Sequence, residues 1–263
     1  MILVVDVGNT ELTIGLFNEA ELRGHWRIMT DVARTADEFG ILLRSLLTAS
    51  GFRADDVTSV AIGSVVPRVT APLSEACESY FTVAQPLVVD ARATLPIVLD
   101  VDEPLTVGAD RLLNTLAASR LFGCDAIVVD MGTATTFDCI TAEGVFFGGV
   151  IAPGVLTAAD SLTRRTSKLP ATELTLPTRV IGRRTEECIR AGVLFGAADA
   201  IDGIVGRIKA SWPRTQLPQV VATGGFADTM ARLCATFDRV EPHLTLQGLQ
   251  MAHAILRGAE PSL

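Results

Sequence analysis

The feature of this sequence that most constrains its fold is a segment that occurs twice. The N-terminus reads ILVVDVGNTELTIGLF after Met1, and residues 127–141 read IVVDMGTATTFDCIT. With Asp6 aligned on Asp130, the two copies share the pattern V-V-D-x-G, 124 residues apart. In each copy a continuous apolar run, typical of a strand buried on both faces, leads into a carboxylate and a turn of small polar residues. A fold built from two similar halves is therefore expected.

The residues around each copy predict the same series of elements in both halves. Apolar runs predict three consecutive strands joined by short polar turns, and helical spacing of apolar residues then predicts a helix. In the first half the strands are expected over residues 2–7, 12–17 and 22–29, and the helix over 36–50. In the second half the strands are expected over residues 126–131, 135–141 and 144–152, and the helix from about 154.

The rest of the chain reads as further strands and helices. Strands are expected from residues 57 and 86 and at QVVATGG, helices from residue 108, over 184–209 and twice in the tail, and a surface loop over the polar residues 164–182. We therefore expect an α/β fold of two lobes, residues 1–120 and residues 121–263. If the lobes face each other, the turns after Asp6 and Asp130 meet across a cleft.

Composition argues against several other classes of protein. With 49% hydrophobic and 20% charged residues, the chain of 263 residues is expected to be compact. Its net charge of −8 and the lack of a basic cluster argue against nucleic-acid and membrane binding. No apolar run approaches the ~18 residues of a transmembrane helix, and the start MILVVDVGNT does not read as a signal peptide, so a cytoplasmic protein is expected. The five Cys and three His show no metal-ligand spacing.

The repeated turn has a chemistry suited to phosphate. A tight turn of Gly and small residues exposes backbone N–H groups that can cradle phosphate oxygens, and Thr and Asn side chains add donors. A carboxylate repels phosphate, but it can hold a hydrated Mg²⁺ that bridges to it. Two such turns suggest a nucleoside triphosphate held from both sides, with water excluded so that a phosphoryl group goes to an alcohol. The alternative for a single copy is that Asp-x-Gly only forms a hairpin turn.

Five segments occur in an order that resembles a known family. They are VDVGNT at 5–10, VGADRLLN at 107–114, VVDMGTATTFD at 128–138, GGVIAPG at 148–154 and HLTLQGL near the end. Together they are similar to the type III pantothenate kinases, of the actin-like, sugar kinase and Hsp70 ATPase superfamily. The resemblance implies two ribonuclease-H-like lobes facing each other across a nucleotide cleft. It also implies ATP-dependent phosphorylation of the 4′-hydroxyl of pantothenate, the first step of coenzyme A biosynthesis, by a homodimer that needs Mg²⁺ or another divalent cation and K⁺ or NH₄⁺.

The same resemblance implies a role for each motif residue. Asp110 is expected to be the general base, Asp6 to help place Mg²⁺ through the phosphates, and Asp130 to bind the monovalent cation. The expected ATP contacts are the turn residues Asp6, Val7, Gly8, Asn9, Thr10, Glu11, Leu12 and Thr13, together with Thr133. The expected pantothenate contacts are Val101, Gly108, Ala109, Asp110, Arg111 and Thr185.

Several of these residues also have a purely structural interpretation. Asp110 can complement a helix N-terminus, Arg111 can be a solvated helix residue, and Thr185 can be a helix N-cap. Two positions depart from the family pattern: Val101 stands where members often have a Tyr against pantothenate, and Thr13 stands where many have a Lys. The first departure concerns affinity for pantothenate, and the second concerns phosphate binding.

Two glycine patterns have open interpretations. Residues 221–225, VATGG, look like a third strand-to-glycine turn suited to a base or ribose, although Gly also simply ends strands. Gly192, Gly196, Gly203 and Gly206 recur on the long helix and suggest a face that another segment approaches closely. That face is either a dimer seam or a surface packed on the sheet.

Two other functions are left open by the sequence. The first is a kinase of the same fold that acts on another small alcohol, which Val101 allows. The second is a non-catalytic accessory or regulatory role, because some relatives are described as transcriptional accessory factors. An acidic chain without a basic helix argues against direct DNA binding, and the presence of Asp110 argues against a loss of catalysis.

Overall fold

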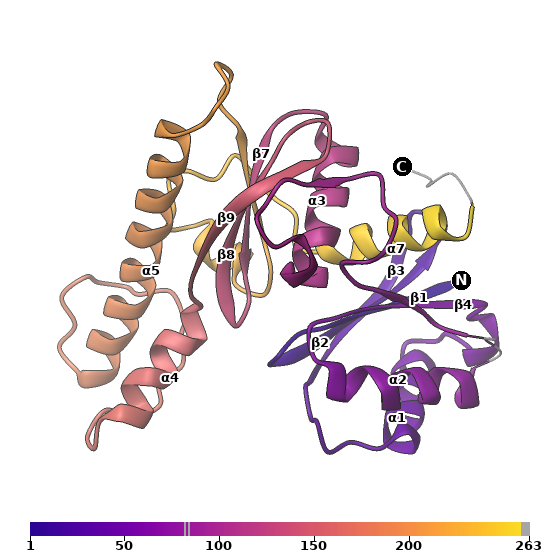
Figure 1. Ribbon diagram of the computed structural model, residues 1–263. Coiled ribbons are helices and arrows are strands. Elements are labelled where there is room, and N and C mark those ends of the chain that lie inside the picture. The colour runs from indigo at the N-terminus through magenta and orange to yellow at the C-terminus, as the bar shows by residue number, and fades with distance from the viewer. Residues whose placement is uncertain (82, 84, 259–263) are drawn as a thin grey trace. The chain divides into compact units, whose positions relative to one another are not determined.

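The computed structural model describes residues 1–81, 83 and 85–258 and forms two compact units (Figure 1). The first unit comprises Met1–Leu121 together with the segment that begins at Leu244, and the second comprises Phe122–His243. The expected division at residues 120 and 121 differs from this at the C-terminal end of the chain. There the segment from Leu244 belongs to the first unit and not to the second.

The first unit is built on a sheet whose strands follow the order β3-β2-β1-β4-β5. These strands are β1 (Ile2–Val7), β2 (Glu11–Asn18), β3 (Glu21–Met29), β4 (Ser59–Ser64) and β5 (Leu87–Val89). The first three form an antiparallel meander, and β4 and β5 extend the sheet parallel to β1. The meander expected over the first 30 residues is confirmed.

Helices cover both faces of this sheet. They are α1 (Ala36–Ala49), α2 (Pro67–Tyr80), α3 (Ala109–Phe122) and α7 (Leu244–Leu256). Because successive residues of a strand point to opposite faces, the apolar run of β1 supplies two core layers. Leu3 and Val5 pack in a cluster with residues of α1 and α2. Val4 packs in a second cluster with residues of α3 and α7, which explains why the segment from Leu244 joins this unit.

Local sequence sets both ends of α1. Thr35 and Glu38 form a capping box: the Glu38 backbone N–H donates to Thr35 Oγ1 at 3.3 Å, and the Thr35 N–H donates to the Glu38 carboxylate at 2.8 Å. After the C-cap residue Ser50, Gly51 has a φ of +83°, a left-handed conformation that ends helices. The helix expected over residues 36–50 and its stop at Gly51 are confirmed.

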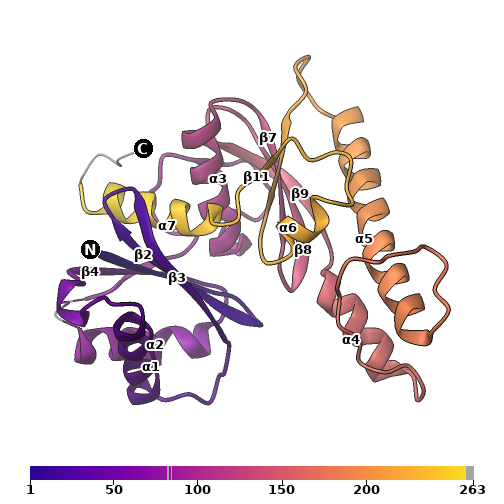
Figure 2. The same cartoon turned by 180° about the vertical axis from the view of Figure 1, so that it is seen from behind.

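The second unit repeats the strand order of the first. Its sheet contains β7 (Ala126–Met131), β8 (Ala134–Ile140), β9 (Val145–Pro153), β10 (Gln219–Thr223) and β11 (Arg239–Val240), in the order β11-β10-β7-β8-β9. Again three strands form an antiparallel meander and two extend it in parallel. Helices α4 (Val155–Arg165), α5 (Thr185–Ala210) and α6 (Ala227–Met230) complete the unit, and Figure 2 shows α6 and β11 from the other side.

The two units match in register as well as in order. Asp6 on β1 lies opposite Gly63 on the parallel strand β4, and Asp130 on β7 lies opposite Thr223 on the parallel strand β10. The repeated carboxylate therefore occupies the same place in both sheets. The late strand QVVATGG is the counterpart of β4, an equivalence that the sequence comparison of the two copies did not reach.

The long helix α5 turns its glycines away from the described chain. Residues that include Ile189, Val193 and Ile201 face the core of the second unit. A Cβ added at Gly192, Gly196, Gly203 or Gly206 would meet no atom within 4 Å among the described residues. The suggestion that this face packs on the sheet is therefore wrong, and the alternative of a dimer seam stays a prediction.

Some short elements were not predicted from the sequence patterns. They are β6 (Val98–Leu99), β11 and two single turns of 3-10 helix, Ala54–Asp56 and Pro104–Thr106. Residues 166–184 contain neither helix nor strand, in agreement with the expected loop. Within the described ranges, no helix has the length and apolar character needed to traverse a bilayer.

Candidate active site

The turn between β1 and β2 is shaped by a small set of hydrogen bonds. The pairing of Val7 with Leu12 leaves residues 8–11 as the turn, and the Gly8 N–H donates to the carbonyl of Glu11 at 3.0 Å. Thr30, the residue after β3, supports the turn, because its Oγ1 donates to the Gly8 carbonyl at 2.7 Å and its N–H donates to the Thr10 carbonyl at 2.8 Å. The turn is thus fixed in shape before any ligand arrives.

The expected ATP contacts in this turn differ in what they can offer. The side chains of Val7 and Leu12 are fully buried in the core, so only their backbone could face a ligand. Asn9 is exposed, and Asp6, Gly8 and Thr10 are half-buried. The groups available to a phosphate are therefore backbone N–H groups and short polar side chains, which suits an anion.

The start of α3 lies at the same edge of the sheet as this turn. The Val65 N–H, just after β4, donates to the Val7 carbonyl at 3.1 Å. A Cβ added at Gly108 would lie 3.3 Å from Cγ1 of Val65. The segment Gly108-Ala109-Asp110-Arg111 therefore begins beside the carboxyl ends of β1 and β4, where the Asp6 turn also begins.

Asp6 and α3 also share a face of the sheet. A Cβ added at Gly63, the residue opposite Asp6, would lie 2.8 Å from Cδ1 of Leu113 on α3. Along β1, Asp6 alternates to the same face as Val4, which packs in one cluster with Leu113. The structure thus brings together, within the first unit, the turn after Asp6 and the GADR segment, two motifs that the family resemblance assigns to one site.

Asp110 has the properties of a carboxylate withdrawn from water. Burial raises its pKa, while the backbone N–H and guanidinium of Arg111 lower it by a smaller amount. The Arg111 N–H donates to Asp110 Oδ1 at 2.8 Å. A side chain at Gly108 would collide with the same oxygen, so only Gly leaves room for the carboxylate in this position. A raised pKa at an active-site carboxylate favours proton acceptance.

The other expected pantothenate contacts in the first unit are less informative. Ala109 is buried at the start of α3, and Arg111 is half-buried, so the interpretation of Arg111 as a solvated helix residue is wrong. Val101 is half-buried and lies between β6 and the 3-10 turn Pro104–Thr106. Asp110 does accept an N–H at the start of a helix, so its alternative role and its expected role are compatible.

The second unit builds a similar but shorter turn. Met131 pairs with Thr135, which leaves residues 132–134, one residue fewer than in the first turn, and the Gly132 N–H donates to the Ala134 carbonyl at 3.0 Å. The carbonyl of Thr133 accepts from the Gly154 N–H at 3.2 Å and from the hydroxyl of Thr157. Gly154, the last residue of the GGVIAPG segment, therefore closes against this turn.

A third turn reaches Asp130 from β10. Gly224 has a φ of +88°, and a Cβ added there would lie 2.5 Å from Asp130 Oδ1. The segment VATGG was interpreted from sequence as a possible base or ribose site, and its contact with Asp130 was missed. The contact could not be predicted because it depends on the parallel pairing of β10 with β7, which no local sequence pattern reveals.

Thr185 is an exposed residue at the amino end of α5. It is the first residue of the helix, and the N-cap is Arg184, whose side chain makes no capping hydrogen bond. The N-cap interpretation of Thr185 is therefore wrong. Its expected contact with pantothenate stays a prediction.

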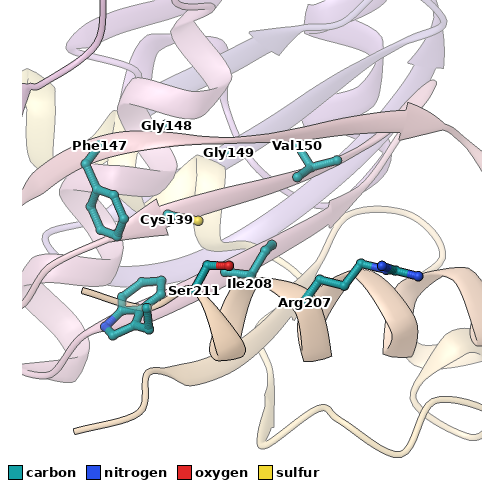
Figure 3. A pocket seen from close by; sticks show the side chains of 9 residues that line it. Cys139, Phe147, Gly148, Gly149, Val150, Arg207, Ile208 and Ser211 are labelled. Atoms are coloured by element: carbon teal, nitrogen blue, oxygen red, sulfur yellow. The ribbon is translucent and has the colours of Figure 1, made fainter. Parts of the chain in front are cut away.

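Figure 3 shows a pocket in the second unit whose lining residues differ from those of the turn after Asp130. It has a volume of about 330 Å³ and lies between β9 and the last turns of α5, with Cys139 on β8 among its lining residues. Cys139 pairs with Ile127 near the amino end of β7, whereas Asp130 is near its carboxyl end. None of the expected site residues lines the pocket, so we assign it no role in the reaction.

The donor set around the turns suits a cation that is shared with a nucleotide. Among the described residues, no three His, Cys, Asp or Glu side chains gather into a group that could hold a metal by themselves. Asp6 and Asp130 each place one carboxylate beside a turn. Mg²⁺ usually keeps several waters and is bound through one or two carboxylates plus phosphate oxygens. Asp6 and Asp130, each within its own unit, are therefore each suited to a cation that phosphate oxygens also bind.

Solved structures of other proteins share this fold. A protein assigned to the Baf family of transcriptional activators from Campylobacter jejuni matches with a TM-score of 0.56 at 18% identity, over 95% of this chain and 96% of that one. A protein assigned as a 2-dehydro-3-deoxygalactonokinase from Sinorhizobium meliloti matches at 0.55 and 12% identity, over 98% and 100%. The activator of 2-hydroxyisocaproyl-CoA dehydratase from Clostridium difficile, with bound ADPNP, matches at 0.52 and 13% identity, over 97% and 93%.

The duplicated α/β sheet and these neighbours define a protein of the actin-like ATPase and sugar kinase fold. Within that class, the family model of the type III pantothenate kinases matches residues 2–207. The chain belongs to the type III pantothenate kinase family.

Proposed function

We propose that the protein transfers the γ-phosphoryl group of ATP to the 4′-hydroxyl of pantothenate, the first step of coenzyme A biosynthesis. The observation that carries the proposal is the position of Asp110. Asp110 lies in the first turn of α3, and burial raises the pKa of its carboxylate. The start of α3 lies at the same edge and on the same face of the sheet as the turn that follows Asp6. The proposal thus assigns a phosphate cradle and a proton acceptor to the same unit. The family supplies pantothenate as the acceptor alcohol.

In the proposed reaction Asp110 orients and deprotonates the alcohol. The 4′-oxygen forms a bond to the γ-phosphorus, the bond from that phosphorus to the β–γ bridging oxygen breaks, and ADP leaves with that electron pair. The hydroxyl proton passes to a carboxylate oxygen of Asp110. Such transfers depend on positioning and charge neutralisation more than on early proton removal, so a carboxylate within hydrogen-bond reach is sufficient. In this proposal Gly108, Ala109 and Arg111 bind pantothenate together with Asp110, and Val101 and Thr185 are its further expected contacts.

The two turns bind the phosphates of ATP in this proposal. In this proposal the residues Asp6 to Thr13 of the first turn bind the phosphates, and Thr133 of the second turn is a further ATP contact. A divalent cation supplies charge neutralisation when bound, with Asp6 as the residue that would help to hold it. Asp130 would hold K⁺ or NH₄⁺, and the close packing of Gly224 on its carboxylate supports a position that is fixed rather than mobile.

We further propose that the protein is a homodimer joined through α5. Glycine inside a helix costs about 1 kcal/mol relative to alanine, yet α5 has four glycines on a face that meets nothing in the described chain. Close approach of a second helix explains that composition, because small residues allow backbones to lie near each other. The expected location in the cytoplasm stays a part of this proposal.

A kinase of the same fold with another small alcohol as substrate is the second candidate. It is favoured by Val101, which cannot stack on pantothenate as an aromatic residue would. A non-catalytic role is less well supported, although the neighbour from Campylobacter jejuni is assigned as a transcriptional activator. The withdrawn carboxylate of Asp110 has no evident use in such a role.

The test is ADP release by the purified protein with ATP, Mg²⁺ and pantothenate, in K⁺ and in Na⁺. We expect activity that requires K⁺ and is lost in Asp110→Asn. Asp55→Asn is the matched control, because Asp55 is an exposed carboxylate of the same unit, paired with Arg53 at 3.2 Å. Activity that survives in Asp110→Asn would remove the assigned base. Wild-type activity with a different alcohol, and none with pantothenate, would select the second candidate.

A further inference from the structure

We propose that Arg27 is a nucleotide-binding residue whose guanidinium binds the terminal phosphates of ATP at the Asp6 turn. The inference rests on the proposed function in one respect, the identification of this turn as a phosphate site. It goes beyond that function because the residue lies on β3, outside every motif that marks the site. It is carried by strand register, by one side-chain contact and by the balance of charge.

Strand register places Arg27 in line with Asp6. Asp6 pairs with Thr13 on β2, and Thr13 pairs with Arg27 on β3. Residues directly opposite each other on neighbouring antiparallel strands point to the same face. Asp6, Thr13 and Arg27 thus form one row on the sheet face where α3 begins. With neighbouring strands about 4.8 Å apart, the Cα atoms of Asp6 and Arg27 are separated by about 10 Å.

The guanidinium of Arg27 is directed along β3 toward the turn. Its Nη1 lies 3.9 Å from Oε2 of Glu11, the residue that ends the turn and begins β2. The two side chains are 54% and 41% exposed. An exposed pair at this distance contributes little to stability, so Arg27 can exchange the Glu11 carboxylate for a phosphate at small cost. The pair therefore keeps the cation near the turn without committing it to a structural role.

The negative charge around the turn favours a guanidinium at this position. Asp6, Glu11 and Asp110 place three carboxylates in its vicinity, and a bound nucleoside triphosphate adds more negative charge. A divalent cation offsets a part of that charge. The planar fork of an arginine matches two oxygens of a phosphate at once, and such charge-assisted bonds are stronger than neutral ones. Arg27 can supply this contact from the far side of Thr13.

The test compares variants of Arg27 by direct calorimetric titration with ATP, ADP and adenosine, each with Mg²⁺. We expect Arg27→Gln to lower the affinity for ATP roughly tenfold. The affinity for ADP should fall less, and the affinity for adenosine should stay unchanged. Arg27→Lys, which keeps the charge without the fork, is expected to restore part of the loss. Arg23→Gln is the matched control, because Arg23 is an exposed arginine of the same strand, paired with Glu21 at 3.1 Å.

The pattern across the three ligands separates a phosphate contact from a structural effect. An equal loss of affinity for ATP and for adenosine, or no loss of affinity for ATP, would overturn the inference. The titrations contain no pantothenate, so they also separate this inference from the proposed function. If the wild-type protein binds ATP but does not phosphorylate pantothenate, the substrate assignment fails and the ligand pattern still decides the role of Arg27. If the wild-type protein binds none of the three ligands, both fail.

Discussion

Gly224 packs directly on the carboxylate of Asp130. A Cβ at this position would lie 2.5 Å from Oδ1 and 2.7 Å from the backbone nitrogen of Met131. The relationship arises because β10 runs parallel to β7 with Thr223 opposite Asp130, so that both strands end at the same edge. Gly224 is thereby a positioning residue for a carboxylate that, in our proposal, binds a monovalent cation.

Gly224→Ala is expected to displace Asp130 and to weaken the response to K⁺. Perturbing a group that orients a metal-binding carboxylate typically costs roughly 10- to 100-fold in affinity or activity. The measurement is the K⁺ concentration that gives half-maximal ADP release. Gly123→Ala is the control for backbone strain, because Gly123 also has a positive φ, +60°, but no neighbouring atom within 4 Å. Equal effects of the two substitutions would show that strain alone is responsible.

Arg111→Gln is expected to move the acid side of the pH–activity profile to higher pH. The guanidinium and N–H of Arg111 lower a pKa of Asp110 that burial has raised. The unprotonated carboxylate accepts the proton, so loss of the guanidinium raises the pH at which activity begins. The profile of kcat/KM against pH measures this shift. Arg120→Gln, at the exposed far end of α3, should leave the profile unchanged.

Substitutions on the glycine face of α5 are expected to disrupt the dimer. Gly196→Leu places a bulky side chain where a second helix must approach closely, so light scattering should show a monomer at concentrations where the wild type is a dimer. Ser45→Leu, at an exposed position of α1, tests whether added apolar surface alone has an effect. If the glycine face is instead exposed to solvent, Gly196→Ala should raise the free energy of unfolding by about 1 kcal/mol. Such a stabilisation would contradict the dimer.

The stability of the first unit is expected to fall in mild acid because of His253. This residue is 7% exposed on α7, with Nε2 2.5 Å from Ser59 Oγ. Burial, and to a smaller extent the charge of Arg257, lowers its pKa below 6.5. Below pH 6.5 the unfolded chain therefore takes up a proton that the folded chain resists.

The contribution of neutral His253 is complete above pH 6.5 and is lost as the pH falls through the lowered pKa of the folded state. The free energy of unfolding should decline by at most about 1.4 kcal/mol per pH unit from this group. Urea denaturation from pH 5 to 7.5, in His253→Gln and in the wild type, measures the decline. A slope that persists in His253→Gln, or that disappears in the exposed-site control His25→Gln, would contradict the assignment.

The sequence was sufficient for the features that depend on local pattern. The apolar runs before Asp6 and Asp130 and the short polar turns after them predicted both meanders, and the confirmed strands reproduce those segments closely. The position of each repeated carboxylate near the end of its first strand followed from the same runs. Strands of two residues, such as β6 and β11, carry too little pattern to be distinguished from loops.

Features that depend on distant partners were beyond the sequence. The tail was expected to be helical, but no local pattern showed that α7 packs against β1 and β4. The contact between Gly224 and Asp130 requires the parallel pairing of β7 and β10, which has no signature in either strand. The same limit applied to α5: the glycine spacing indicated a special face, and only the folded chain showed that this face points outward.

The return of α7 to the first sheet has a consequence for the order in which the protein can be completed. Met1–Leu121 emerges from the ribosome first, but one face of its sheet stays without Leu246 and Leu249 until the chain beyond His243 has been made. The second unit, Phe122–His243, is continuous and can close on itself earlier. The half that is synthesised first is therefore finished last, and the part of its apolar face that α7 covers stays exposed during that interval, when aggregation competes with folding.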